Sequence, residues 1–343
     1  MYNKMNKIKN EIKKGVTMKN KELSRDGSFK RQGALFSRQF GAEEGALPVE
    51  KNRYRLIWAK PCPWSHRAVI VRKILGLEDA ISLGEVDPIR PLVSRIDWAF
   101  TLDENEKDPI LGIKYLSEIY VKTDPNYLGR PTVPVLIDVK EEKVVHNDYF
   151  ILTNQLATDW ASFHREHAPN LYPEHLRFQI DELNDVIYED VNNGVYKCGF
   201  AKSQRAYEKA YDALFARLEQ LDERLSKRRF LFGDFITDAD VRLYVTLVRF
   251  DVAYYSVFKA NKKRLVDFPN LWGYARDLYR TPGFYDTTDF DAIKKHYYLS
   301  ARLSPDALEE EMIIPKGPDL SGWNIDPERE HLSNTKEKFF HSE

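Results

Sequence analysis

Short apolar runs separated by a helical stretch predict a small α/β unit in the first half of the chain. The run Arg53–Ala59 has the apolar and aromatic character of a buried strand, and the residues after it repeat with helical spacing up to Gly76. Ala80–Val86 is predicted as a second strand, which completes the opening of a βαβ unit. A long polar insertion at Asp87–Gly112 follows. Beyond it the pattern predicts one helix and two strands joined by a tight turn, at Lys114–Val121, Thr132–Lys140 and Lys143–His146.

From Tyr149 onward the spacing of apolar residues becomes helical throughout. Thr237 and Asp240 stand three residues apart at the start of one helix, a pattern typical of a capping box. Ser300–Glu343 contains four prolines and no sustained period, so this segment is predicted to be an irregular tail that either wraps the body or is mobile. Helices are predicted at Tyr149–Phe163, Pro173–Asn192, Ala206–Leu225, Asp238–Tyr255, Asn270–Tyr279 and Phe290–Leu299.

These elements predict an α/β domain followed by an all-α domain. We expect a disordered basic tail at 1–27, with a translation start at Met18 as an alternative, and an N-terminal extension at 28–52. The sheet-containing domain is placed at 53–160 and the helical domain at 161–300, with the irregular tail at 301–343. A chain of 343 residues is long enough for two such domains, each with its own core.

Composition narrows the possible functions. The 52 basic and 53 acidic side chains give a net charge of −1, so no overall field favours nucleic acid or an anionic membrane. No apolar run approaches the length of a membrane span, and no apolar stretch follows the first lysines as in a secretory signal. Two cysteines exclude a disulfide scaffold and a cysteine-cluster zinc site, so we expect no metal and a reducing, cytoplasmic location.

Cys62 is the principal candidate for chemistry. It lies in the segment Lys60–Arg67, on the predicted turn between a strand and a helix, and Pro63 suits the first helical turn. Unpaired N–H groups and the helix dipole at such a position favour an anion, which should lower the thiol pKa and expose a nucleophilic thiolate. His66, four residues on, is interpreted as structural, and Cys198 as inert.

A second proline strengthens this interpretation. Val133-Pro134 stands at the start of the predicted strand Thr132–Lys140. This is the place where thioredoxin-like folds put a cis-proline whose backbone faces the active-site sulfur. The sheet-containing domain is therefore predicted to be thioredoxin-like.

Motifs in the expected order over about residues 28–300 resemble those of the glutathione transferase superfamily, and within it the glutathionyl-hydroquinone reductases, or xi class. The fold that this resemblance implies is a thioredoxin-like domain followed by an all-helical glutathione-transferase domain. The segments that carry the resemblance are Cys62–Arg67, Gly129–Leu136, Asn192–Phe200, Asp240–Leu243, Leu247–Asp251 and His296–Tyr298.

The resemblance implies a cysteine-dependent thiol transferase or reductase. In this reaction the Cys62 thiolate attacks the sulfur of a glutathionyl-hydroquinone thioether, and the hydroquinone leaves. A mixed disulfide remains on Cys62, and a second thiol resolves it. Because no cysteine lies two residues further on, a small thiol must be the resolving group.

The resemblance also implies roles for individual residues. Tyr196 and Tyr297 match the active-site tyrosines of the family and would donate to the ring oxygens of the substrate. Trp98 matches a tryptophan that lines the thiol site, and Arg130 would neutralise a carboxylate of the thiol. Val133, before Pro134, would pair its backbone with the cysteinyl part of the thiol.

One departure from the superfamily concerns the thiol itself. A Glu-Ser or Gln-Ser pair usually holds the γ-glutamyl group at the start of the helix after the last strand, whereas this chain has Asp148 and Tyr149 there. The serine hydroxyl is therefore replaced by a phenol. Glutathione, mycothiol and bacillithiol all remain candidates for the cosubstrate.

Other interpretations stay open at this point. An omega-like thioltransferase acting on dehydroascorbate or protein mixed disulfides would share the single cysteine. A non-catalytic interaction module would share only the fold, and the position of Cys62 disfavours it. The expected partners are a small thiol and a quinone conjugate, with no nucleic acid and no membrane, and the expected assembly is a homodimer.

Overall fold

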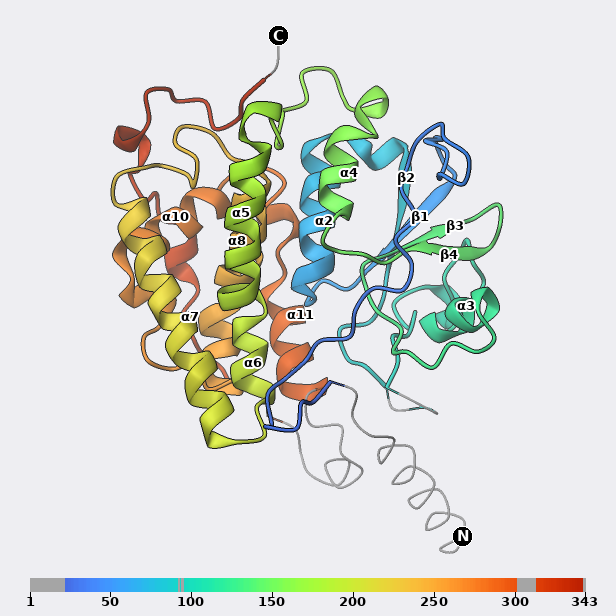
Figure 1. Cartoon of the computed structure of the whole chain (residues 1–343), viewed down its shortest axis with the longest axis horizontal. Coiled ribbons are helices and arrows are strands. Elements are labelled where there is room, and N and C mark those ends of the chain that lie inside the picture. The colour runs from blue at the N-terminus through green and yellow to red at the C-terminus, as the bar shows by residue number, and fades with distance from the viewer. Residues whose placement is uncertain (1–21, 92, 94–95, 301–312, 342–343) are drawn as a thin grey trace, which may run out of the picture.

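The computed structural model describes residues 22–91, 93, 96–300 and 313–341. Most of the predicted basic tail lies outside these residues. The described chain has two halves that lie side by side, one built around a small sheet and the other entirely helical (Figure 1). The α/β-plus-all-α architecture expected from the sequence is confirmed.

The sheet has four strands in the order β2-β1-β3-β4. The strands are β1 (Tyr54–Trp58), β2 (Ile81–Glu85), β3 (Val135–Asp138) and β4 (Lys143–His146). β1 runs parallel to β2 and antiparallel to β3, and β3 runs antiparallel to β4. This mixed order is that of a thioredoxin-like domain. The prediction of β3 began three residues too early, because Pro134 has no N–H with which to join the ladder.

Three helices accompany the sheet: α2 (Pro63–Ile74), α3 (Leu116–Thr123) and α4 (Leu152–Thr158). α2 is buried along almost its whole length between the sheet and the helical half. The start of α4 differs from the prediction, which put it at Tyr149. Asp148 Oδ1 accepts a hydrogen bond from the Phe150 N–H at 2.9 Å, and this local turn delays the helix by three residues.

The helical half is a bundle whose central helix, α8, is buried at every position. A capping box between Thr237 and Asp240 starts α8, as the sequence predicted. Three predicted helices instead pass into single π-helical turns, at Tyr188–Asn192, Phe250–Tyr254 and His296–Ser300. The α-helical segments are α5 (Arg177–Ile187), α6 (Gly194–Phe200), α7 (Gln204–Leu225), α8 (Asp238–Arg249), α9 (Tyr255–Val257), α10 (Pro269–Tyr279) and α11 (Phe290–Lys295).

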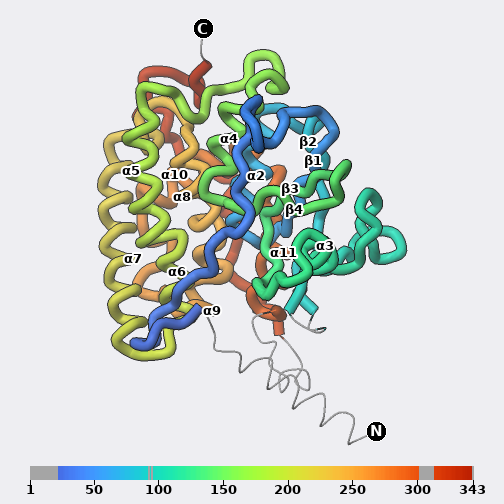
Figure 2. The backbone as a smooth tube through the Cα atoms, turned by 45° about the vertical axis from the view of Figure 1, so that its right-hand side comes forward, coloured from blue at the N-terminus to red at the C-terminus, as the bar shows by residue number. Residues whose placement is uncertain are grey.

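The N-terminal segment, residues 22–52, crosses both halves as an extended strap (Figure 2). At one end the carbonyl of Gly27 accepts from Lys202 N–H at 2.9 Å, just before α7. At the other end Phe36 accepts from Asn147 N–H at 2.7 Å, and Ser37 forms a bridge with His146 beside β4. The strap therefore ties the sheet to the helical bundle.

The C-terminal segment, residues 313–341, wraps the helical half. Trp323 is buried edge-on against Trp272 of α10, with ring centroids 4.8 Å apart. Arg329 is also buried and donates to the carbonyl of Leu225 at the end of α7. Of the two states expected for the tail, the wrapped one applies to these residues, while 301–312 lie outside the described residues.

Within the described ranges, every helix is too short or too polar to cross a bilayer.

Candidate active site

Cys62 is the N-cap residue of α2, at the turn that leaves β1. Its side chain is 8% exposed, and Sγ lies 3.4 Å from the carbonyl oxygen of Val133. The peptide bond between Val133 and Pro134 is cis, as expected from the sequence. The thiol thus faces the backbone of a second, distant segment, which is the arrangement predicted for a thioredoxin-like site.

A buried arginine from the helical half holds the turn before Cys62. Arg249, at the end of α8, donates to the carbonyls of Pro61 and Lys60 at 2.7 and 2.9 Å. It also donates to Nδ1 of His66, whose Nε2 lies 3.0 Å from the Thr287 hydroxyl. Burial, together with the charge of Arg249, puts the pKa of His66 well below its usual value. His66 is therefore neutral, in agreement with its interpretation as structural.

Three tyrosine hydroxyls form a chain in the helical half, next to the Cys62 turn. Tyr196 of α6 and Tyr297 lie 2.7 Å apart, and Tyr254 lies 3.1 Å from Tyr297. The Tyr196 ring lies 6.0 Å from that of Trp64, two residues after Cys62. Burial raises the pKa of all three phenols, so each keeps its proton as a donor.

Tyr254 and Arg249 were not singled out as site residues from the sequence. Both lie in or beside a motif that carried the family resemblance, Leu247–Asp251, so the signal was present. Tyr254 also stands in a π-helical turn, as Tyr297 does, and Tyr196 follows another closely. Such turns are frequent at functional sites because they change which way side chains point.

Trp98 is buried in the polar insertion and stacks on His296, with ring centroids 5.4 Å apart and planes 14° apart. His296 directly precedes Tyr297, so Trp98 lies beside the tyrosine chain. The guanidinium carbon of Arg90 lies 4.8 Å from the centroid of the Trp98 ring. The part of the insertion around Trp98 is thus packed beside the site, whereas residues 101–107 are largely exposed.

Arg130 pairs with a carboxylate from the strap. Its two terminal nitrogens lie 3.0 and 3.1 Å from the oxygens of Glu22. Arginine commonly binds carboxylates in this bidentate geometry, and binding a carboxylate of the thiol is the role expected of Arg130. In this structure the partner is the protein's own Glu22.

Asp148 and Tyr149 lie between β4 and α4. The Tyr149 ring packs on Trp64 with centroids 4.6 Å apart, and its hydroxyl lies 3.3 Å from that of Tyr188. Its hydroxyl is therefore already engaged within the aromatic cluster.

Cys198 of α6 is only 2% exposed, and burial raises the pKa of its thiol to about 12. Both observations agree with an inert cysteine.

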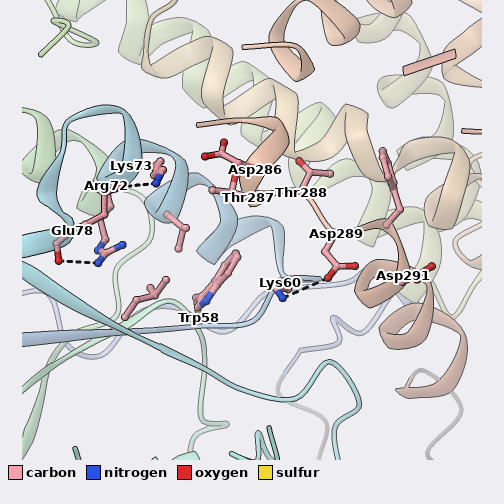
Figure 3. A pocket seen from close by; sticks show the side chains of 13 residues that line it. Trp58, Lys60, Arg72, Lys73, Glu78, Asp286, Thr287, Thr288, Asp289 and Asp291 are labelled. Atoms are coloured by element: carbon pink, nitrogen blue, oxygen red, sulfur yellow. Dashed lines mark hydrogen bonds and ion pairs between the residues drawn. The ribbon is translucent and has the colours of Figure 1, made fainter. Parts of the chain in front are cut away.

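A cleft of about 530 Å³ opens elsewhere, between the sheet-bearing half and the segment that leads into α11 (Figure 3). Lys60 bridges Glu85 and Asp289 there. None of the predicted site residues lines this cleft. Its lining comprises Trp58, Lys60, Val69, Arg72, Lys73, Glu78, Leu83, Asp286, Thr287, Thr288, Asp289, Phe290 and Asp291.

The fold and the cysteine site together define a glutathione-transferase type of protein. Residues 204–277 match the family described as the C-terminal domain of glutathione S-transferase. The chain is 40% identical over 286 residues to glutathionyl-hydroquinone reductase YqjG of Escherichia coli, covering 81% of this chain and 86% of that one. It is 36% identical over 298 residues to glutathionyl-hydroquinone reductase PcpF of Sphingobium chlorophenolicum, covering 84% and 91%.

Solved structures agree. The xi glutathione S-transferase of Phanerochaete chrysosporium is 39% identical, with a TM-score of 0.80 over 88% of this chain and 95% of that one. The glutathione-bound structure of Escherichia coli YqjG is 37% identical, with a TM-score of 0.77 over 89% and 98%. The chain belongs to the glutathionyl-hydroquinone reductase, or xi-class glutathione transferase, family, whose relatives are enzymes of the glutathione transferase superfamily.

Proposed function

We propose that this protein removes glutathione, or a related low-molecular-weight thiol, from thiol-conjugated hydroquinones through a mixed disulfide on Cys62. The observation that carries the proposal is the convergence of two groups of different chemistry. Cys62 Sγ faces the Val133 carbonyl, and the hydroxyl chain of Tyr196, Tyr297 and Tyr254 begins one ring away, across Trp64. A nucleophile for sulfur and donors for ring oxygens thus share one site.

The first step transfers the thiol from carbon to sulfur. The Cys62 thiolate attacks the thioether sulfur, a sulfur–sulfur bond forms, and the carbon–sulfur bond breaks. In the keto tautomer of the conjugate, the ring carbon that bears the sulfur already carries a proton. The electron pair of the broken bond then moves through the ring onto oxygen, and the hydroquinone leaves as a phenolate that takes up one proton. The ring is reduced and the two sulfurs are oxidised.

A second molecule of thiol completes the cycle. Its thiolate attacks the mixed disulfide, releases a small-molecule disulfide and restores Cys62. Cys198 is too deeply buried to act as a resolving group. The resolving thiol must therefore come from solution.

The tyrosines supply the proton donors that the first step needs. Their raised pKa values keep them protonated at neutral pH, so they can donate hydrogen bonds to a developing oxyanion. Removing one such donor typically slows a reaction by about 100- to 1000-fold. The Tyr196 and Tyr297 hydroxyls, 2.7 Å apart, would act as a pair.

The thiol would lie across Cys62 on the strand-like Val133-Pro134 backbone. Arg130 would bind one of its carboxylates in exchange for Glu22, with Trp98 of the insertion and the residues just before α4, Asp148 and Tyr149, lining the rest of the thiol site. The identity of the thiol depends on Tyr149, since its ring occupies the position of the usual serine. Glutathione, mycothiol and bacillithiol are therefore tested together. A homodimer stays a prediction.

A thioltransferase acting on mixed disulfides is the second candidate, because several relatives carry omega-like names. Glutathione S-transferase omega-like 2 of Schizosaccharomyces pombe is 40% identical over 285 residues, covering 81% of this chain and 90% of that one. Disulfide exchange needs the cysteine but not the tyrosine chain. The ratio of the two activities therefore separates the candidates.

Mass spectrometry of the intact protein tests the proposal. The protein is exposed in turn to the disulfides of glutathione, mycothiol and bacillithiol, and the adduct on Cys62 is identified. Turnover of the matching hydroquinone thioether is then followed by release of free hydroquinone. An adduct on Cys62 without turnover of the thioether would favour the second candidate, the thioltransferase. Turnover that persists in Cys62→Ser would overturn both candidate functions.

A further inference from the structure

Arg31 belongs to the strap, yet its guanidinium lies in the aromatic cluster beside Cys62. The Arg31 Cζ atom is 4.6 Å from the ring centroid of Trp64 and 4.4 Å from that of Tyr196. The ring centroid of Phe29, also in the strap, lies 5.3 Å from the same Cζ atom. These distances are those of cation–π contacts. The strap thus places a positive charge between the nucleophile's helix and the tyrosine chain.

The hydrogen bonds of Arg31 leave part of the guanidinium without an acceptor. Nε donates to Oδ1 of Asn193 at 2.9 Å, in the turn that leads into α6. The buried Nη2 atom has no hydrogen-bond partner among the described residues. A buried charged donor without an acceptor is costly, so such a group usually has a ligand as its partner.

The charge of Arg31 also acts on the neighbouring phenols. Burial raises the pKa of Tyr196, and the largest effect in the opposite direction comes from Arg31. At Tyr149 too, burial raises the pKa of the phenol and the charge of Arg31 lowers it. A group that favours a phenolate on tyrosine would favour one on a substrate ring bound at the same place.

We infer that Arg31 binds the phenolate oxygen of the departing hydroquinone and so completes the ring-binding side of the site. This inference rests on the proposed function and extends it to a residue outside both domains. The strap is then part of the active site as well as a structural tie.

The chemistry of the first step explains why a cation is needed there. Breaking the carbon–sulfur bond sends an electron pair onto the ring oxygen, so negative charge develops away from Cys62. Neutral tyrosines can donate hydrogen bonds to that oxygen, while Arg31 adds a full positive charge in a water-poor site. Exchange with a simple disulfide develops no charge on a ring and should not need Arg31.

Two substrates test this inference in one protein. We expect Arg31→Gln to slow release of hydroquinone from a glutathionyl-hydroquinone by about 100- to 1000-fold, the range for loss of one oxyanion partner. Reduction of bis(2-hydroxyethyl) disulfide should stay within about threefold, since sulfur attack is unchanged. Arg31→Lys should recover part of the loss, because it keeps the charge and loses the planar fork.

Arg38→Gln is the matched control. Arg38 lies on the same strap, is exposed, and donates only to the carbonyls of Gly45 and Ala46. Both reactions should be unchanged in it. Equal losses of both reactions in Arg31→Gln, or no loss of either, would overturn the inference.

Binding of 4-nitrophenol gives a readout that does not depend on turnover. The wild-type protein should enrich the coloured phenolate form of the bound probe at a pH near the probe's own pKa, and Arg31→Gln should not. Equal enrichment in both proteins, or none in the wild type, would overturn the role of Arg31. Failure of the proposed function would appear differently, as a wild-type protein inert toward hydroquinone thioethers.

Discussion

The two sides of the site are built in different ways. On the thiol side, Cys62 lies in the turn after β1 and Val133 lies just before β3. The pairing of these two strands brings the two residues together. On the ring side, Tyr196, Tyr254 and Tyr297 come from three places up to 101 residues apart, and their hydroxyls meet only because the helices pack. The position of the nucleophile is therefore set by the strand–turn–helix geometry and by the pairing of β1 with β3, whereas the ring side is set by the packing of helices.

Because of this difference, substitutions should be able to change one side of the site without changing the other. The nucleophile needs only the turn before α2 and a facing backbone, which Arg249 and the sheet hold in place. The tyrosine chain depends on the π-helical turns at Phe250–Tyr254 and His296–Ser300. Variants that act on one side only should therefore separate sulfur chemistry from ring chemistry.

The largest effect is expected from Cys62→Ser, because both reactions pass through this sulfur. Thioether cleavage and disulfide exchange should each fall by at least about 10³-fold, since a hydroxyl at neutral pH is a far weaker nucleophile than a thiolate. The fold should be unchanged, because serine is close to cysteine in size and can donate the same hydrogen bond to the Val133 carbonyl. Steady-state rates with both substrates measure the loss.

Cys198→Ala is the matched control for this prediction. Its thiol is buried in α6 and its pKa is raised to about 12, so it takes no part in exchange. Activity should stay within about twofold, with a small loss of stability from the truncated side chain. An inactive Cys198→Ala with a normal melting temperature would mean that the wrong cysteine has been assigned.

Phenylalanine variants of the tyrosines should affect the ring side alone. Tyr196→Phe and Tyr297→Phe should each slow hydroquinone release by about 10- to 1000-fold, while a simple disulfide is reduced at nearly the normal rate. Tyr254→Phe should have a smaller effect, because its hydroxyl reaches the pair through Tyr297 at 3.1 Å. The double variant of Tyr196 and Tyr297 should lose less than the product of the single losses.

Tyr207→Phe is the control for the loss of a phenol. Its hydroxyl, on α7, donates to the carbonyl of Lys259 and takes no part in the hydroxyl chain of the site. It should leave both reactions unchanged. If Tyr196→Phe instead slowed both reactions equally, the tyrosine would be a packing residue for the α2 turn.

The thiol side was more predictable from the sequence than the ring side, for the same physical reason. A strand, a proline-bearing turn and a helix start within ten residues, so local rules located Cys62, and a second proline located its partner segment. Strand β4 was predicted to the residue. Tyr196 and Tyr297 entered through the family resemblance, since nothing in helical spacing distinguishes a site tyrosine from a packed one.

The remaining features depend on contacts between distant segments. Arg31 and Arg249 appear ordinary in the sequence, and only packing brings their guanidinium groups to the Cys62 turn. The π-helical turns cannot be predicted from spacing, because the helical period of the sequence continues through them without a break. Glu22 could not be anticipated as the partner of Arg130, which lies 108 residues away.

Tyr149→Ser tests how specific the thiol side is for glutathione. Restoring a serine should provide a hydrogen bond to the γ-glutamyl carboxylate, worth about 0.5–1.5 kcal/mol net, or up to about 3 with a charged acceptor. Affinity for glutathione should rise by roughly 2- to 100-fold. Calorimetric titration measures it, with mycothiol and bacillithiol titrated beside glutathione.

Tyr149→Phe serves as the comparison for that variant. It keeps the ring on Trp64 and loses only the hydroxyl that reaches Tyr188, so it should gain nothing toward glutathione. Tight binding of glutathione by the wild type, unchanged in Tyr149→Ser, would contradict the idea of a different thiol. The plain glutathione-dependent interpretation would then hold.

The smallest expected effect compares how each side of the site responds to acid. His146, at the end of β4, and His296, beside Tyr297, are both held neutral, as burial lowers the pKa of each to about 4. In the unfolded chain a histidine titrates near 6.5. Each therefore contributes stability that is fully present above pH 6.5 and is lost as the pH falls toward 4.

Asparagine variants isolate these two contributions. In His146→Asn the amide oxygen can still accept from Asp148 N–H, and in His296→Asn the amide nitrogen can still donate to the Pro88 carbonyl. Each variant should flatten the fall in unfolding free energy between pH 6.5 and 4 by up to about 1.4 kcal/mol per pH unit, one proton's worth. Denaturant titrations across this pH range measure the slope. A slope unaltered in both buried variants would mean that neither side is held neutral by burial, and a change in only one would identify the side that is more shielded from water.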